Sequence, residues 1–354
     1  MGAQNMPGKH ASNVRTKHKY LDWLKQADGK DEKTLDKVAA ALTAFEKAVG
    51  GKDFKQFHRG WGERFKAHLA KARNKRTKKP LSPSTVDAML AYVKGFVKWL
   101  ADQPGYKSRI SHSDAAYFNN SRKCRRVAHA ARPVPYPSMD QALHAFQAMP
   151  EGDQYERRDK ALFAFFMLTG ARDGAVASLL LKHVNLFDGH VFQDPRDVAT
   201  KNGKLIDTWF FPVDPLYREC LERWITYLRE VELFGDTDAV FPKAAMGMVD
   251  KRFAKVGFAR EGYASGAPLN AIIKAAFRWV QMHPFTPHAF RKTLVRYGDG
   301  VCSSMEQHKA WSMNMGHSHL ATTVNSYLPV TRERQGEVMK GFALGQSLKS
   351  SETK

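Results

Sequence analysis

Residues 286–293 have the sequence TPHAFRKT, which contains the signals that decide the fold of the second half of the chain. Thr286 and Pro287 are typical of a helix start, because proline fits the first helical turn. The three-residue spacing then puts His288 and Arg291 on the same face of that helix. An imidazole beside a guanidinium is suited to binding a phosphate group. We therefore interpret this helix as part of an anion site.

Four more residues suited to phosphodiester chemistry lie elsewhere in the second half. Arg172 follows a break in the helical pattern of LTGARDGAVASL, and Lys201 stands beside an Asn-Gly turn in ATKNGK. His317 and Tyr327 both belong to MGHSHLATTVNSY. Two guanidiniums can hold the non-bridging oxygens of a phosphate under attack. A lysine can protonate the leaving 5′ oxygen, and a tyrosine can attack the phosphorus once a base or a positive field removes its proton.

Each of these residues, taken singly, also has an ordinary structural interpretation. An arginine at a helix start is usually a surface salt-bridge former, and Tyr327 alone would more often belong to the core. His317 and His319 could instead form a metal site with His283 and His308, but their spacings match no standard zinc pattern. No cluster of Asp and Glu near these motifs is suited to two metal ions. We therefore expect neither a metal nor a cofactor.

Net charge divides the chain unevenly. The 354 residues include 56 Lys and Arg against 35 Asp and Glu. Residues 1–138 hold 29 basic and 11 acidic residues, a net charge of +18, whereas residues 139–354 hold 27 and 24, a net charge of +3. Such an excess in one segment indicates a polyanionic partner, with nucleic acid ahead of a membrane surface. The alternative is a well-solvated surface with no such partner.

Nothing in the sequence indicates a leader or a membrane span. The N-terminal stretch lacks the apolar run of a signal peptide, and no stretch is long and apolar enough to cross a bilayer. The three cysteines fit neither a zinc motif nor a disulfide framework. We expect a cytoplasmic protein with no membrane partner.

The first part of the chain predicts a small helical domain over residues 21–118, preceded by a flexible basic arm over residues 1–20. Apolar residues recur at spacings of three and four over residues 34–49, 61–72 and 84–100, which predicts three helices. The cationic run KARNKRTKKP lies between the second and the third of these helices. Its candidate DNA-binding residues are Lys75, Arg76, Lys78 and Lys79.

Residues 119–138 are predicted to form an extended basic linker, since prolines at 133, 135 and 137 forbid a helix there. Residues 139–345 predict a mainly helical domain with one small antiparallel sheet, and from about residue 215 onward only helices are expected. Residues 346–354 are expected to be disordered. The linker adds four candidate DNA-binding residues, namely Arg122, Lys123, Arg125 and Arg126.

The motifs together resemble the tyrosine recombinase family, which includes phage integrases. Its members show, in order, an Arg, a Lys on a β-hairpin, a His-x-x-Arg, a His or Trp, and a Tyr. The resemblance covers about residues 140–330. It implies the mainly α fold of DNA breaking-rejoining enzymes, with a SAM-like helical core-binding domain before a mixed α/β catalytic domain. In this chain the same order is given by Arg172, Lys201, His288 with Arg291, His317 and Tyr327.

The resemblance implies a site-specific recombinase or integrase of a phage, genomic island or other mobile element. The two arginines would hold the scissile phosphate, and Lys201 would be the general acid. His288 would accept the tyrosine proton or order the site, and His317 would donate to a phosphate oxygen. Tyr327 would form a covalent 3′-phosphotyrosine bond.

The resemblance also implies partners. These are double-stranded DNA with a specific recombination site, three further copies in a synaptic homo-tetramer, and accessory DNA-bending proteins. Residues 334–345 are a candidate helix for docking onto a neighbour, or equally onto their own domain. A bacterial protein associated with the nucleoid when bound to DNA is expected.

Three departures from the family pattern are visible. The family commonly has Glu three residues after the first Arg, where this chain has Ala175, with Asp173 as an alternative. The second His and the Tyr lie ten residues apart instead of nine. Lys204 competes with Lys201 for the role of general acid.

Two other functions stay open at this point. A type IB topoisomerase-like enzyme would use the same chemistry to nick and reseal DNA without exchanging partners. A catalytically dead DNA-binding protein would serve architecture or regulation. The intact set of six residues favours an active enzyme.

Overall fold

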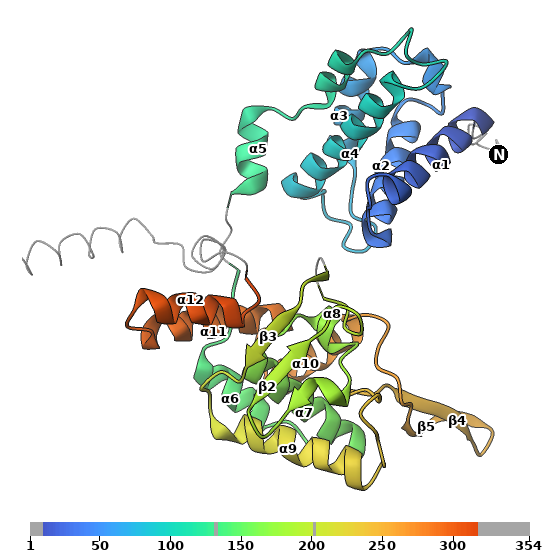
Figure 1. Ribbon diagram of the computed structural model, residues 1–354. Coiled ribbons are helices and arrows are strands. Elements are labelled where there is room, and N and C mark those ends of the chain that lie inside the picture. The colour runs from blue at the N-terminus through green and yellow to red at the C-terminus, as the bar shows by residue number, and fades with distance from the viewer. Residues whose placement is uncertain (1–9, 131–133, 201–202, 318–354) are drawn as a thin grey trace, which may run out of the picture. The chain divides into compact units, whose positions relative to one another are not determined.

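The computed structural model describes residues 10–130, 134–200 and 203–317. The chain divides into two compact units, residues 1–132 and residues 133–354, and each is described by itself (Figure 1). The expected docking segment 334–345 and the expected disordered tail 346–354 lie outside the described residues. Among the helices that are described, none is long and apolar enough to cross a membrane.

The first unit is a bundle of helices around an aromatic core. The ring of Phe45 lies 5.5–5.9 Å from four other rings, those of Phe54, Trp61, Phe65 and Phe118. Aromatic rings at such separations stabilise a core beyond the area that they bury. The helices are α1 (Ala11–Gln26), α2 (Glu32–Ala48), α3 (Gly60–Lys71), α4 (Pro83–Ala101) and α5 (Arg122–His129), with short 3-10 helices at Phe54–Gln56 and His112–Phe118.

The expected flexible arm over residues 1–20 is wrong for residues 11–20, which belong to helix α1. The fully buried Asn13 amide donates to Glu46 Oε1 at 3.1 Å and to the Lys52 carbonyl at 2.9 Å, and its oxygen accepts from the Phe54 amide at 3.0 Å. Tyr20 adds an apolar anchor. These side chains are spread among polar residues, so the helical period is weak in the sequence.

The extended linker predicted over residues 119–138 is wrong for Arg122–His129, which form helix α5. Ser121 caps this helix by accepting from the Cys124 amide at 3.1 Å. The carboxylate of Asp87 on α4 holds both ends, at 3.1 Å from Asn120 Nδ2 and 3.1 Å from His129 Nε2. The prolines start only at residue 133, too late to prevent a helix that ends at residue 129.

The second unit packs its helices around α7, which is buried along most of its length. The ring of Phe163 on α7 lies within 6.4 Å of rings on four surrounding elements. A three-stranded antiparallel sheet in the order β1-β2-β3 packs beside these helices. The elements are α6 (Met139–Gln147), α7 (Gln154–Thr169), α8 (Asp173–Val176), a 3-10 helix (Leu181–His183), β1 (Val184–Asn185), β2 (His190–Gln193), β3 (Ile206–Trp209), α9 (Pro215–Glu230), α10 (Ala267–Trp279), α11 (Pro287–Val301) and α12 (Met305–Asn314).

The expectation of only helices after residue 215 is wrong, because β4 (Ala244–Val249) and β5 (Arg252–Phe258) form a hairpin that projects from the unit (Figure 1). Its turn residues Asp250 and Lys251 have φ values of 47° and 61°. Hairpin turns with positive φ usually contain Asn or Gly, so the Asp-Lys pair does not announce the turn. The Tyr155 hydroxyl fixes the base of the hairpin by accepting from the Gly257 amide at 3.0 Å.

The fold class expected from the sequence is confirmed: the chain is mainly helical, with small antiparallel sheets in the second unit. Helices α11 and α12 pack closely because a glycine lies at their contact. A Cβ atom on Gly298 would come 2.5 Å from Trp311 Cε2, and the Trp311 Nε1 atom donates to the Leu294 carbonyl at 3.1 Å. This contact sets the spacing between the two helices.

We therefore expect Gly298→Ala to lower the free energy of unfolding by about 1–3 kcal/mol, since overpacking a tight contact costs about that much. Gly300→Ala on the same helix is the matched control, because no atom lies within 4 Å of its Cβ position. The control should be neutral or more stable by up to about 1 kcal/mol. Urea unfolding of both variants measures the difference, and equal stabilities would show that the two helices do not need this contact.

Candidate functional site

Helix α11 carries two of the predicted site residues, His288 and Arg291, and it is held at its start by the segment before α6. The Thr293 hydroxyl donates to the Pro137 carbonyl at 2.6 Å, and the Lys292 amine donates to the Val134 carbonyl at 3.4 Å. Thr286 has the extended backbone of an N-cap and Pro287 occupies the first turn, as the sequence predicts. The helix is therefore fixed along its path before it presents Arg291.

The guanidinium of Arg291 connects three separate segments of the second unit. Its side chain is only 2% exposed. Nη1 donates to the Gly170 carbonyl at the end of α7, and Nη2 donates to the Met315 carbonyl at 2.6 Å. Nη2 also lies 2.9 Å from His317 Nε2. Gly170 has φ = 55°, and a Cβ atom there would come 3.1 Å from Leu294 and Met315 side-chain atoms, so glycine suits this junction.

His317 is a neutral imidazole at physiological pH. Burial lowers its pKa to about 4, and the charges of Arg291 and Arg172 lower it further, with smaller effects from His288 and Lys204. Arginine cannot accept a hydrogen bond, so His317 Nε2 accepts from Arg291 and the proton of the neutral ring lies on Nδ1. The ring can therefore donate from Nδ1. Four of the predicted or competing site residues act electrostatically on this one imidazole, which brings them into one neighbourhood.

Arg172 lies at the N-cap of α8, partly exposed, directly after the break at Gly170. The following Asp173 is held by Asn270 on α10, whose Nδ2 donates to Asp173 Oδ2 at 2.6 Å. Asp173 Oδ1 accepts from the Gly174 amide at 2.9 Å. Ala175, at the position where the family commonly has Glu, is buried. Asp173 thus ties α8 to α10, a role that the sequence did not indicate.

His288 is solvent-exposed, yet its pKa is lowered, first by desolvation and then by Arg291 and Arg172. Because two cations act on it, the unprotonated ring is favoured near neutral pH. An unprotonated imidazole can accept a proton. The geometry therefore keeps both site histidines neutral beside two fixed positive charges.

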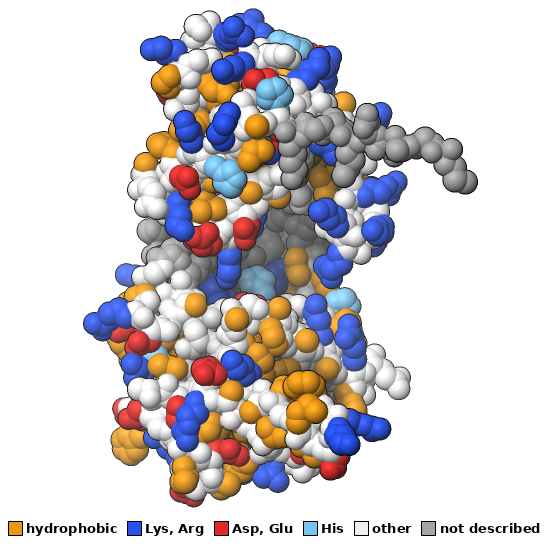
Figure 2. All heavy atoms as spheres, turned by 90° about the vertical axis from the view of Figure 1, so that its right-hand side faces the viewer, with side chains coloured by type: hydrophobic (Ala, Val, Ile, Leu, Met, Phe, Trp, Pro, Cys, Tyr) orange, Lys and Arg blue, Asp and Glu red, His pale blue; other side chains and the backbone are white. Residues whose placement is uncertain are grey.

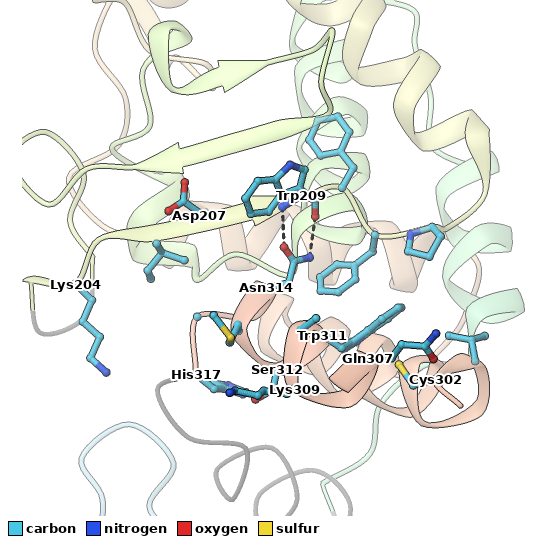
Figure 3. A pocket seen from close by; sticks show the side chains of 18 of the residues that line it. Lys204, Asp207, Trp209, Cys302, Gln307, Lys309, Trp311, Ser312, Asn314 and His317 are labelled. Carbon is cyan, nitrogen blue, oxygen red and sulfur yellow. Dashed lines mark hydrogen bonds between the residues drawn. The ribbon is translucent and has the colours of Figure 1, made fainter. Parts of the chain in front are cut away.

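Lys204 stands just before β3, at the rim of a cavity of about 1130 Å³ between β3 and α12 (Figure 3). Trp209, Trp311 and His317 are among the lining residues. Figure 3 shows the Lys204 side chain extending from the start of β3 on the same side as His317. Lys201, the preferred general acid, and Tyr327, the predicted nucleophile, both lie outside the described residues.

The candidate DNA-binding residues of the first unit are all exposed and form two clusters. The loop between α3 and α4 is closed by Asn74, which accepts from the Arg76 and Thr77 amides at 2.9 and 3.0 Å. This turn presents four cations to solvent, Lys75, Arg76, Lys78 and Lys79. Helix α5 presents the other four, Arg122, Lys123, Arg125 and Arg126. On the face drawn in Figure 2 the first unit carries more Lys and Arg than Asp and Glu side chains.

The alternative metal site is not supported by the part of the chain that the structure covers. Within residues 10–130, 134–200 and 203–317, no group of three His, Cys, Asp or Glu side chains could hold a metal ion. His283 and His308 belong to this part, whereas His319 does not.

The lowered pKa of His317 predicts a pH-dependent stability. Since the folded-state pKa of about 4 lies below the ordinary 6.5, folding gains stability above pH 6.5 that is lost as the pH falls towards 4. We expect His317→Gln to lose less stability than the wild type between pH 7 and 4, by on the order of 2 kcal/mol. Urea unfolding across this range measures it, with the exposed His18→Gln as control. Parallel curves for wild type and His317→Gln would contradict a buried neutral ring.

Comparison with known proteins identifies the fold. No protein-family model matches this sequence, and no curated protein is similar to it. Among solved structures, a lambda integrase dimer bound to a COC′ core site is 13% identical, with a TM-score of 0.61 over 90% of this chain and 96% of that one. The Tn1549 transposon integrase in complex with transposon right end DNA is 14% identical, with a TM-score of 0.56 over 94% and 99%.

A lambda integrase tetramer bound to a Holliday junction is also similar, at 14% identity and a TM-score of 0.58, over 88% of this chain and 79% of that one. These neighbours are tyrosine recombinases, so the family resemblance noted in the sequence extends to the structure. The chain therefore has the fold of the tyrosine recombinases.

Proposed function

We propose that this chain is a site-specific DNA recombinase that cleaves and rejoins DNA through a 3′-phosphotyrosine intermediate. The observation that carries the proposal is the neighbourhood of His317, on which Arg291, Arg172, His288 and Lys204 all act. Two arginines with two neutral histidines form a site suited to a phosphodiester whose charge grows during attack. The fold is the one in which the neighbouring integrases bind DNA.

Each side chain has a chemical role in this proposal. Arg291 supplies a fixed positive charge, and the more exposed Arg172 reaches a non-bridging oxygen of the scissile phosphate. His317 donates to a phosphate oxygen from Nδ1, and His288 accepts the phenol proton. Tyr327 attacks the phosphorus, and the bond between phosphorus and the 5′ oxygen breaks.

The 5′ oxygen must gain a proton as it leaves. Lys201 is our choice for the donor because it follows the preceding strand-like sequence directly, and Lys204 is the alternative. Deprotonation of a phenol with an ordinary pKa near 10 needs the positive field of the two arginines. Tyr327 and Lys201 enter by their place in the family motif, since both lie outside the described residues.

DNA is the proposed substrate, held chiefly by the first unit. The two exposed clusters of that unit, four cations in the loop after α3 and four on α5, can contact the phosphate backbone without reading its sequence. One neighbour is a tetramer on a Holliday junction, which supports a homo-tetramer as the acting form. A bacterial cytoplasmic protein that joins the nucleoid on DNA, helped by accessory DNA-bending proteins, belongs to the same proposal.

Tyr327→Phe tests the nucleophile. The variant should bind DNA within about twofold of the wild-type affinity but form no covalent adduct that survives SDS, because phenylalanine lacks the attacking oxygen. Tyr297→Phe, on α11, is the matched control and should keep the adduct. Adducts are counted on gels in EDTA, where the wild type should still react. An undiminished adduct in Tyr327→Phe would assign the nucleophile to another residue.

The same assay separates the rival functions on a supercoiled plasmid that carries two recombination sites. A recombinase exchanges the sites, whereas a topoisomerase-like enzyme only relaxes the plasmid. A dead DNA-binding protein gives neither product and no adduct. Either of these last two results would overturn the proposal.

Salt dependence tests the two cationic clusters. Each phosphate contact that is lost should reduce the slope of log K against log salt by about 0.9. Replacing Lys75, Arg76, Lys78 and Lys79 with alanine should therefore lower the slope by about 2–4 and weaken binding similarly on all sequences. Replacing exposed Lys25 and Lys33, which lie outside both clusters, is the control. Unchanged slopes in the fourfold variant would remove this loop from the interface.

A further inference from the structure

The side chain of Asn314, the last residue of α12, pairs with the backbone of the edge strand β3. Its Oδ1 accepts from the Trp209 amide at 2.7 Å, and its Nδ2 donates to the Trp209 carbonyl at 2.8 Å (Figure 3). A neighbouring strand would make the same two bonds with an edge residue. The amide of Asn314 thus replaces one residue of a missing strand.

The position of Trp209 explains why these bonds are available. β3 is at the edge of the sheet, and Trp209 lies opposite His190 of β2. In an antiparallel pair, alternate residues direct both backbone groups away from the partner strand. Trp209 is such a residue, so its N–H and C=O point towards α12, where they need a partner.

Two more contacts join β3 to the end of α12. The buried Thr208 hydroxyl donates to the Asn314 carbonyl at 3.1 Å. Gly316, with φ = 69°, faces Ile206, and a Cβ atom there would come 3.1 Å from the Ile206 side chain. The strand therefore meets the segment that leads into His317 over its whole length.

His317 does not depend on this contact for its own place. Arg291 holds the Met315 carbonyl and the His317 ring from α11, and Trp311 is bonded to the Leu294 carbonyl of the same helix. If Asn314 let go, α12 and His317 would stay on α11. The part left to move would be β3, with the residues just before it.

We propose that Asn314 is a positioning residue that holds the β2–β3 hairpin, and with it the lysine that serves as general acid, in register with the phosphate site. This inference rests on the proposed function. Lys204 lies two residues before β3 and Lys201 five residues before it, so a shift of the strand moves either amine. A misplacement of about 1 Å at a reacting group can reduce a rate by about 100-fold.

The role can be separated from a general structural one by the leaving group. In the proposed step the bond from phosphorus to the 5′ oxygen breaks while the lysine gives its proton to that oxygen. A substrate with sulfur at this bridging position releases a thiolate, which needs no proton because thiols have a pKa of about 8.5. Such a substrate makes the lysine dispensable but still needs the arginines and His317.

The experiment measures single-turnover adduct formation by Asn314→Ala on oxygen and sulfur substrates of the same sequence. On the oxygen substrate the rate should fall about 10- to 100-fold, and on the sulfur substrate it should return to within about threefold of wild type. DNA affinity should stay within about twofold. Lys201→Ala and Lys204→Ala show which lysine gives the same pattern. Met313→Ala, an exposed neighbour on α12, is the control for both substrates.

Asn314→Asp provides a second variant of nearly the same size, in which an oxygen replaces the donor that faces the Trp209 carbonyl. It should show the same pattern even if the alanine variant folds poorly. Wild-type rates in both variants, or an equal defect on both substrates, would overturn the positioning role. If the wild type itself forms no adduct with either substrate, the proposed function fails first and the role of Asn314 fails with it.

Discussion

The second unit depends on one buried guanidinium. Removing a charge from water costs several kcal/mol unless hydrogen bonds replace the lost hydration. Arg291 regains them from the Gly170 carbonyl, the Met315 carbonyl and the His317 ring. These acceptors follow α7 and α12, whereas Arg291 itself lies on α11. The end of α7, the body of α11 and the chain after α12 must therefore come together before this charge can be buried.

The nature of these acceptors matters as much as their number. Two carbonyl oxygens and a neutral imidazole satisfy hydrogen bonds without cancelling the positive charge. That charge, together with Arg172, lowers the pKa of both His317 and His288. A carboxylate in the same place would have stabilised the fold equally well but removed the field. The arrangement thus keeps a positive potential available for an anion, which a structural salt bridge would not.

Local spacing predicted part of this site and could not predict the rest. His288 and Arg291 share a helix, so their common face followed from three-residue periodicity, and the start of α11 at Pro287 agrees with it. The contact of Arg291 with His317 spans 26 residues, and only the packing of α11 against α12 creates it. The β4–β5 hairpin escaped notice because its turn lacks glycine, and α5 because basic residues show no apolar period. Asn314 had no motif, since its partner is backbone.

The uneven charge of the chain agrees with a division of labour between the units. A net charge of +18 on residues 1–138 attracts a polyanion over many contacts, each of which is weakened by salt. The second part has a net charge of only +3, yet it holds the two arginines beside His317. Burial makes charge effective at short range, where bulk water would screen it. Binding strength and reaction chemistry can therefore be altered separately, the first by exposed lysines and the second by a few residues around Arg291.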